Sequence, residues 1–310
     1  MFAEENGREK TISEVVPEFL LFTEVKKDRS KETIVKCRDC LRQVQKHCGD
    51  LPVERFSESD LFRLERAMHA KDLSVSRRTS ILLALKSFLR YLRDQKHLTV
   101  FDPEKIEIPK RKRNQHVVYL TPDEVERFVS AIKITNYRGG VYAAGLRFRA
   151  LVEALLGSAM RISEVLSLNR DQIDLKSAEA MIIGKGGKKR PVFFTDRALH
   201  WIQQYLKTRT DDYPALFVCQ DGRTRLKRTD VWRPFTRYRL LAGIAKKVTP
   251  HLLRHTAATQ LLFNGCPVGH IKEILGHRLL ETTCEFYLGL DHRAAKAAHR
   301  KYLVYSPEAA

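Results

Sequence analysis

Three short segments carry side chains suited to chemistry on a phosphate group. Arg161 lies in the run AMRISE, His251 and Arg254 lie in HLLRHT, and His277 closes the tripeptide LGH. A guanidinium is planar and binds two phosphate oxygens at once, so Arg161 and Arg254 are candidates for a phosphate clamp. His251 precedes Arg254 by three residues, which places both side chains on one face if the segment is helical.

Two further residues belong to the same pattern. Lys185 lies in the glycine-rich run GKGGKK, between two strand-like segments, and Tyr287 follows His277 by ten residues. The run GKGGKK does not match the phosphate-binding loop GxxxxGK[ST], so it predicts a basic hairpin and not a nucleotide site.

The elements that must position these residues are predicted to be mainly helical. Residues 11–100 repeat apolar side chains at helical spacing, and they predict four short helices on one core. Residues 102–116 contain Pro103, Pro109 and a basic run, which predicts a linker and not a core element. Thr121 opens a capping box with Glu124 and begins a second unit.

This second unit combines helices with a small sheet. A hairpin is predicted from residues 181–183 and 192–194, joined through glycines, with residues 216–218 as another short strand. Helices are predicted over 122–134, 143–156, 196–208, 229–242, 250–264 and 267–275. The expected fold is therefore mainly α, with a four-helix domain over 1–101, a linker over 102–116 and a mostly helical α+β domain with a small antiparallel sheet over 117–310.

The composition favours a polyanionic partner. The 310 residues carry a formal charge of +19 and a pI near 9.8. Apolar runs stay shorter than the roughly 18 residues of a membrane span. The charged segment Met1–Lys10 does not resemble a secretory signal, so we expect a cytoplasmic, nucleoid-associated protein without membrane contact.

The six cysteines are expected to be reduced thiols in that compartment. Cys37, Cys40, His47 and Cys48 have a spacing that also suggests zinc. A single helix would have to supply these ligands with little geometric freedom, so we expect free thiols and no metal site.

The blocks RISE, GKG, HLLRHT and LGH, in this order and followed by a tyrosine, resemble those of the tyrosine recombinases, the phage integrase and Xer family. The resemblance covers essentially the whole chain, with residues 1–101 similar to the core-binding domain and 117–310 to the catalytic domain. One departure concerns the tyrosine. Many members place it nine residues after the histidine, where this chain has Phe286, whereas Tyr287 stands at ten.

The resemblance implies a role for each residue. Tyr287 attacks a DNA phosphate and forms a 3′-phosphotyrosyl bond, which keeps the phosphodiester energy for rejoining. Arg161 and Arg254 hold the phosphate, and His277 donates to one of its oxygens. His251 donates to the phosphate or accepts the tyrosine proton. Lys185 protonates the leaving 5′-oxygen, with Lys188 and Lys189 as alternatives.

Further implications of the resemblance are a supporting role for Glu164, no cofactor, and double-stranded DNA with an inverted-repeat core site as the partner. It also implies a homotetramer on two duplexes, or a dimer on a single site, with residues 294–303 near the interface between subunits. The basic side chains expected to contact DNA are Arg77, Arg78, Lys86, Arg90, Lys110, Arg111, Arg113, Lys188, Arg225 and Arg228.

The expected function is a site-specific DNA recombinase that exchanges strands through a Holliday junction without metal or ATP. Two alternatives stay open. One is a type IB topoisomerase-like enzyme, which shares the chemistry but relaxes DNA in place. The other is a non-catalytic architectural DNA-binding protein. The sequence leaves open the target site, the order of strand exchange, accessory partners, and the choice between chromosome-dimer resolution and mobile-element integration.

Overall fold

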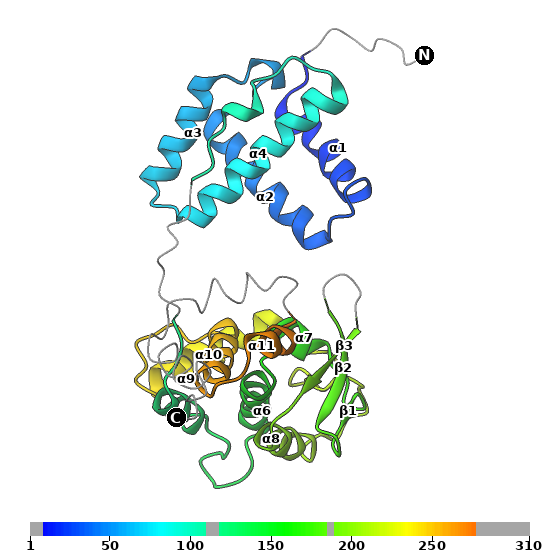
Figure 1. The fold of residues 1–310 in the computed structure, drawn as a ribbon, viewed down its shortest axis with the longest axis vertical. Helices are drawn as coiled ribbons and strands as arrows, with labels where there is room; N and C mark the ends of the chain where they lie inside the picture. The colour runs from blue at the N-terminus through cyan, green and yellow to red at the C-terminus, as the bar shows by residue number, and fades with distance from the viewer. Residues whose placement is uncertain (1–8, 110–117, 185–188, 277–310) are drawn as a thin grey trace, which may run out of the picture. The chain divides into compact units, whose positions relative to one another are not determined.

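The computed structural model describes residues 9–109, 118–184 and 189–276 (Figure 1). The chain divides into two compact units, residues 1–115 and residues 116–310, and each is described by itself. None of the described helices combines the length and apolarity needed to cross a membrane.

The first unit is built from four α-helices around one core. Their bounds are α1 Ile12–Val25, α2 Lys31–Cys48, α3 Glu58–Ala70 and α4 Val75–Lys96, with short 3₁₀ turns η1 Val53–Arg55 and η2 Pro103–Lys105. Ser30 caps α2, and Ser57 forms a capping box with Asp60 at the start of α3. Phe19, Leu64 and Phe88 are almost fully buried between these helices, as their helical spacing predicts.

The start of the predicted linker needs a correction. Residues 102–109 were expected to lie outside any core, yet Ile106 is 1% exposed and Pro103 is buried against the first unit. The two prolines exclude a long helix but not an extended segment, and Ile106 and Ile108 supply apolar side chains that pack on the helices. This segment therefore belongs to the first unit.

The second unit consists of helices with one small sheet at their side (Figure 1). Its helices are α5 Pro122–Ser130, α6 Ala143–Ser158, α7 Ile162–Ser167, α8 Asp196–Leu206, η3 Arg228–Val231, α9 Trp232–Leu241, α10 Pro250–Phe263 and α11 Val268–Leu275. The strands β1 Ile173–Asp174, β2 Glu179–Ile183 and β3 Lys189–Phe193 form an antiparallel sheet in the order β1-β2-β3. Ile183 pairs with Lys189 at the end of the hairpin, as the glycine-rich run predicted.

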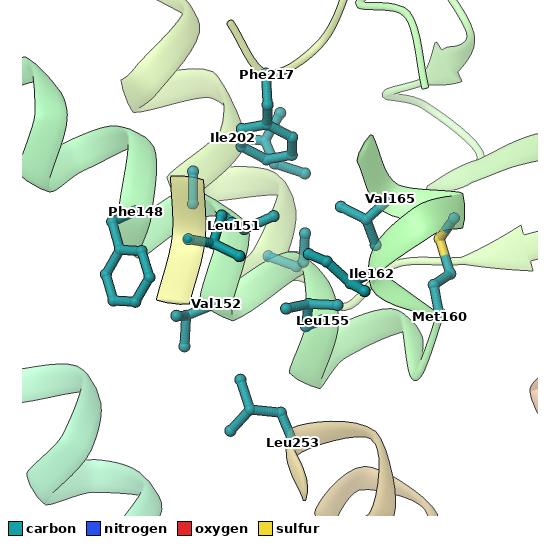
Figure 2. Close-up of a cluster of buried hydrophobic side chains, with 14 of the residues drawn as sticks. Phe148, Leu151, Val152, Leu155, Met160, Ile162, Val165, Ile202, Phe217 and Leu253 are labelled. Atoms are coloured by element: carbon teal, nitrogen blue, oxygen red, sulfur yellow. The ribbon is translucent and has the colours of Figure 1, made fainter. Parts of the chain in front are cut away.

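Helix α6 is the centre of this unit, because it is buried on nearly all sides. Figure 2 shows Leu151 and Leu155 of α6 facing Ile162 of α7, with Leu253 of α10 directed at the same helix. Leu253 is 0% exposed and directly precedes Arg254, so the packing of α10 on α6 fixes the position of that arginine.

One predicted strand does not form. Leu216, Phe217 and Val218 are buried in the core, but the segment makes only single bridges, between Asn169 and Ala215 and between Val218 and Arg225. A short apolar run predicts burial as well as strand structure, and periodicity alone does not separate the two. The very short strand β1 gave no pattern in the sequence.

Candidate active site

Arg161 is held in place by a carboxylate three residues further along the chain. It occupies the N-cap of α7, where its backbone N–H donates to Glu164 Oε2 at 2.9 Å and its Nη1 donates to Glu164 Oε1 at 2.8 Å. The side chain is 34% exposed, so it is fixed on one side and open to a ligand on the other. The sequence RISE thus works as a capping box that also orients a guanidinium.

Glu164 is ionised at its buried position. Burial alone would raise its pKa, but the hydrogen bonds from Arg161 and the positive charge of Arg190 outweigh this effect and hold the pKa below its usual value. The supporting role predicted for Glu164 therefore has a clear geometry, since both carboxylate oxygens bind arginines.

Arg254 links three segments that lie far apart in the sequence. It is 6% exposed on α10, and its Nη1 donates to the carbonyl of Ala159 at 2.7 Å while its Nη2 donates to the carbonyl of Leu275. Ala159 lies two residues before Arg161, and Leu275 is the last residue of α11. These bonds fix the plane of the guanidinium next to the segment that carries Arg161.

His251 lies on the same helix, one turn before Arg254, and is exposed. Its pKa is lowered by partial desolvation and by the positive charges of Arg228, Arg254 and Arg161. These three arginines come from η3, α10 and the start of α7, and the hydrogen bond from Arg254 to the carbonyl of Ala159 joins the last two of these elements. A lowered pKa keeps the imidazole neutral near pH 7, which suits a proton acceptor.

Arg228 joins this group from a separate part of the chain. It begins η3, it is exposed, and its guanidinium carbon lies 5.9 Å from the centre of the Trp232 ring. Trp232 begins α9 and gives the long side chain a surface to lie against. Of the residues expected to contact DNA, Arg228 is one whose positive charge acts on His251 and lowers its pKa.

Arg190 was not among the predicted site residues, although it lies at the centre of the contacts. It stands on β3, is 16% exposed, and donates from Nη2 to Glu164 Oε2 at 3.1 Å. Its Nη1 donates to the carbonyl of Ile274 on α11 at 3.0 Å. The available signal in the sequence was a basic residue directly after the hairpin run GKGGKK, and this position alone does not distinguish it from the neighbouring lysines.

Several predicted residues lie outside the described part of the chain. The catalytic candidates among them are Lys185, His277 and Tyr287, and the DNA-contact candidates are Lys110, Arg111, Arg113 and Lys188. The described neighbours mark where two of these segments begin, because Lys185 follows the end of β2 and His277 follows the end of α11.

Arg225 has hydrogen-bond partners within the second unit. Its Nη1 donates to the carbonyls of Leu166 and Leu168 at 2.8 and 2.7 Å, and its Nη2 donates to Asn169 Oδ1 at 2.6 Å. The side chain is half-buried, and these bonds hold the end of α7. Arg225 therefore has a structural role, and its contact with DNA stays a prediction.

Lys86 and Arg90 on α4 likewise have partners within their own unit, and their contact with DNA stays a prediction. Arg90 forms a two-bond ion pair with Glu104 at 2.9 and 3.0 Å, and Lys86 donates to the carbonyl of Ile106 at 3.3 Å. Lys86 also lies 3.1 Å from Glu104. This face of α4 is covered by residues 102–109, which the sequence analysis had treated as a linker.

Arg77 and Arg78, at the start of α4, are half-buried and have partners in the first unit. Arg77 Nη1 lies 3.6 Å from Cys40 Sγ, and Arg78 contacts the His69 ring. Neither contact involves a carboxylate, so neither arginine is neutralised by these partners.

The cysteines of the first unit are free thiols. Burial raises the pKa of Cys37 and of Cys48 to about 11. Such thiols stay protonated near neutral pH, and a protonated thiol is a poor metal ligand and a poor nucleophile.

Comparisons with known proteins point to one family. The family model described as the phage integrase family matches residues 118–293, which is more than half of the chain. The tyrosine recombinase XerD of Oceanobacillus iheyensis is 29% identical over 300 residues, covering 93% of this chain and 97% of its own. The tyrosine recombinase XerA of Pyrococcus furiosus is 32% identical over 282 residues, covering 89% and 90%.

Solved structures show the same fold. The XerA recombinase crystal structure matches with a TM-score of 0.52 and 27% identity, over 94% of this chain and 99% of that chain. The Tn1549 transposon integrase in complex with a circular intermediate DNA matches with a TM-score of 0.72 and 20% identity, over 93% and 99%. Together with the family model, these relatives show that the chain belongs to the phage integrase family and is a site-specific tyrosine recombinase.

Proposed function

We propose that this recombinase cleaves and rejoins double-stranded DNA at an inverted-repeat core site through a covalent bond between Tyr287 and the 3′-phosphate. The observation that carries the proposal is the convergence of Arg161, His251 and Arg254 from two distant segments. Glu164 and two backbone carbonyls fix the two guanidiniums. Such a cluster of fixed cations suits the charge that develops on a phosphate during transfer.

In this scheme the two arginines hold the non-bridging oxygens of the scissile phosphate. Arg161 is oriented by Glu164 and Arg254 by the carbonyls of Ala159 and Leu275, so neither has to reorganise when charge develops. His277, two residues beyond the end of α11, adds a hydrogen bond to the same phosphate.

The two proton transfers are assigned to different residues. His251, whose pKa is lowered by its arginine neighbours, accepts the proton of Tyr287 as the phenol oxygen attacks phosphorus. Lys185 donates a proton to the departing 5′-oxygen. The phosphodiester bond to the 5′-oxygen breaks as the bond to the tyrosine forms, so reversal with a second DNA strand completes the exchange.

The proposal extends to the two units and to their assembly. We assign the first unit to binding of the DNA core site, and we assign the active state to four subunits on two duplexes. An apolar cavity of about 530 Å³ in the second unit supports the assembly. Leu156, Phe193, Leu261 and Ile274 are among its lining residues, and Phe193 is 51% exposed. This cavity suits apolar side chains of a neighbouring copy, and the alanine-rich residues 294–303 are the candidate segment.

A nicked suicide substrate tests the chemistry. Loss of the short fragment after the nick traps the protein on DNA, so the wild type is expected to form a covalent adduct that survives denaturation. Tyr287→Phe removes the nucleophilic oxygen and leaves the ring, so no adduct is expected. Tyr305→Phe is the matched control and is expected to keep the wild-type yield.

An adduct formed by the Tyr287→Phe variant would place the nucleophile elsewhere. A second assay separates recombination from the type IB topoisomerase-like alternative. A recombinase joins strands from two core sites in one complex, whereas the alternative relaxes a supercoiled plasmid without pairing sites.

A further inference from the structure

We propose that Arg190 is a positioning residue of this active site, which ties the carboxylate that orients Arg161 to the end of the helix that leads to His277. The proposal rests on the function given above, because it assumes that Arg161 and His277 bind the same phosphate. Its support is a set of contacts that is independent of any ligand.

The first contact joins β3 to α7. Arg190 Nη2 lies 3.1 Å from Glu164 Oε2, the same oxygen that accepts the backbone N–H of Arg161. The other oxygen of Glu164 binds the Arg161 guanidinium at 2.8 Å. One carboxylate thus lies between two guanidiniums, and its orientation depends on both.

The second contact joins β3 to α11. Arg190 Nη1 donates to the carbonyl of Ile274 at 3.0 Å, one residue before the carbonyl of Leu275 that accepts from Arg254. Carbonyls at the end of a helix have no partner within the helix. Two arginines, one from β3 and one from α10, therefore hold the last turn of α11 from different elements.

The fit around the guanidinium is close. Gly276 ends α11 with a φ of 62°, a left-handed conformation that favours glycine. A Cβ on this residue would lie 2.5 Å from Arg190 Nε and 2.9 Å from its Cζ. The glycine of the LGH tripeptide thus ends the helix and also leaves room for Arg190.

The chemistry of the side chain explains why an arginine is needed here. The planar fork donates from two different nitrogens to a carboxylate and a carbonyl on separate elements, which a single lysine ammonium cannot do with the same geometry. The strand that carries Arg190 also follows directly after the segment with Lys185. Arg190 therefore connects the clamp, the hairpin and the helix end, although it need not touch the DNA.

The test compares Arg190→Gln with the wild type in single-turnover cleavage of the suicide substrate at saturating DNA. A misplaced clamp is expected to lower the cleavage rate by about 100-fold. Affinity for a single core site is expected to stay within about threefold, because a positioning residue acts on the reacting geometry and not on the phosphates that anchor the protein. Arg190→Lys is expected to fall between the two rates.

Arg170→Gln is the matched control. Arg170 also donates to one backbone carbonyl, that of Asp211 at 3.1 Å, and lies near one carboxylate, that of Asp212 at 3.7 Å. The Arg170→Gln variant is expected to lose about as much thermal stability as Arg190→Gln. Its cleavage rate is expected to stay within about threefold of the wild type. A matching rate loss in both variants would reduce Arg190 to a general stability role and overturn the proposal.

A double variant tests the route of the effect. Because one of the two contacts of Arg190 is with Glu164, the double variant Glu164→Gln with Arg190→Gln should lose less cleavage rate than the product of the two single losses. If the fold losses of cleavage rate in the two single variants multiplied in the double variant, the two residues would act independently, which would also overturn the proposal.

Hydrogen exchange separates a failure of this proposal from a failure of the proposed function. The Gly276 amide donates to the carbonyl of Glu273 at 3.0 Å, and its exchange can be followed in the free protein. Arg190→Gln is expected to speed this exchange about tenfold, since the helix end loses a bond to a charged group. Unchanged exchange would overturn the proposal, whatever the adduct assay shows.

Discussion

The arginines of the candidate active site change the pKa of a neighbouring residue, in addition to their proposed contacts with phosphate. His251 is the clearest case, because partial desolvation and the charges of Arg228, Arg254 and Arg161 all lower its pKa. The ordinary value for this group is 6.5, so its neutral form extends to lower pH than usual. The ability of His251 to accept a proton is thus set by residues that were predicted for their contacts with phosphate.

Removing one of these charges should change the pH dependence of cleavage. The wild-type rate, measured in single turnover at saturating DNA between about pH 5 and 8, is expected to fall as pH drops through the lowered pKa of His251. The Arg228→Gln variant loses a positive charge near His251, so His251 is protonated more easily. The midpoint, the pH at which the cleavage rate is half-maximal, is therefore expected to move up towards 6.5.

Arg223→Gln is the control for this profile. Arg223 is an exposed arginine of the same loop, but it does not contribute to the lowered pKa of His251. Its midpoint is expected to equal that of the wild type. A midpoint that stays in place in Arg228→Gln, or moves down, would exclude His251 as the group that controls the rate.

At the scale of elements, the segment of residues 102–109 shows how a proline-containing stretch can still be part of a core. Ile106 is 1% exposed, and the cations of α4 fold over this segment through Glu104 and the carbonyl of Ile106. Lys86 and Arg90 are thereby used inside the first unit. These two basic residues of α4 therefore stabilise the packing of residues 102–109, and their charge does not by itself indicate a DNA-binding face.

Ile106→Ala is therefore expected to destabilise the first unit by about 2–5 kcal/mol, as large-to-small substitutions in a core do. Hydrogen exchange of the buried amides of α4 in the full chain measures this effect without assuming that both units unfold together. Lys105→Ala changes an exposed neighbour and should cost less than about 0.5 kcal/mol. Equal values for the two variants would show that residues 102–109 are not anchored.

At the scale of the whole molecule, we assign binding of DNA and assembly of subunits to different surfaces. The formal charge of +19 favours DNA as a partner, whereas the apolar cavity near Phe193 and Leu261 suits a protein segment. In this proposal, basic side chains support binding at one site, and the cavity supports the pairing of two sites.

Deleting residues 293–310 should therefore reduce the pairing of two core sites at least tenfold, on the order of a lost apolar contact. Binding to a single site should change by less than about threefold. Sedimentation of the protein–DNA complexes gives both quantities, and equal losses of binding and pairing would contradict the prediction.

Two substitutions in the sheet test whether the pairing of core sites depends on the cavity or on any apolar side chain at the surface. Phe193→Ser removes an apolar side chain that lines the cavity and should mimic the deletion. Met181→Ser is a matched control, because Met181 is 54% exposed on the same sheet but does not line the cavity. It is expected to pair sites as the wild type does.

The sequence by itself determined the helical class, most helix starts and the family. Caps such as Ser30, Ser57 and Thr121 are local signals, since a side chain bonds to a backbone group within three residues. Arg161, His251, Arg254 and Glu164 were found because they stand in short motifs of fixed order. Their chemical roles, and those of Lys185, His277 and Tyr287, stay predictions that the adduct assay tests.

Only the tertiary structure decided which charged residues hold the protein together. The sequence does not distinguish the basic residues Arg225, Lys86, Arg90 and Arg190 from others. In the structure, each donates a hydrogen bond to a partner between 14 and 84 positions away. A guanidinium reaches a carbonyl on another element only after the helices have packed. The physical reason is that burial leaves carboxylates and helix-end carbonyls in need of donors, and which cation supplies them depends on distances that the order of residues does not contain.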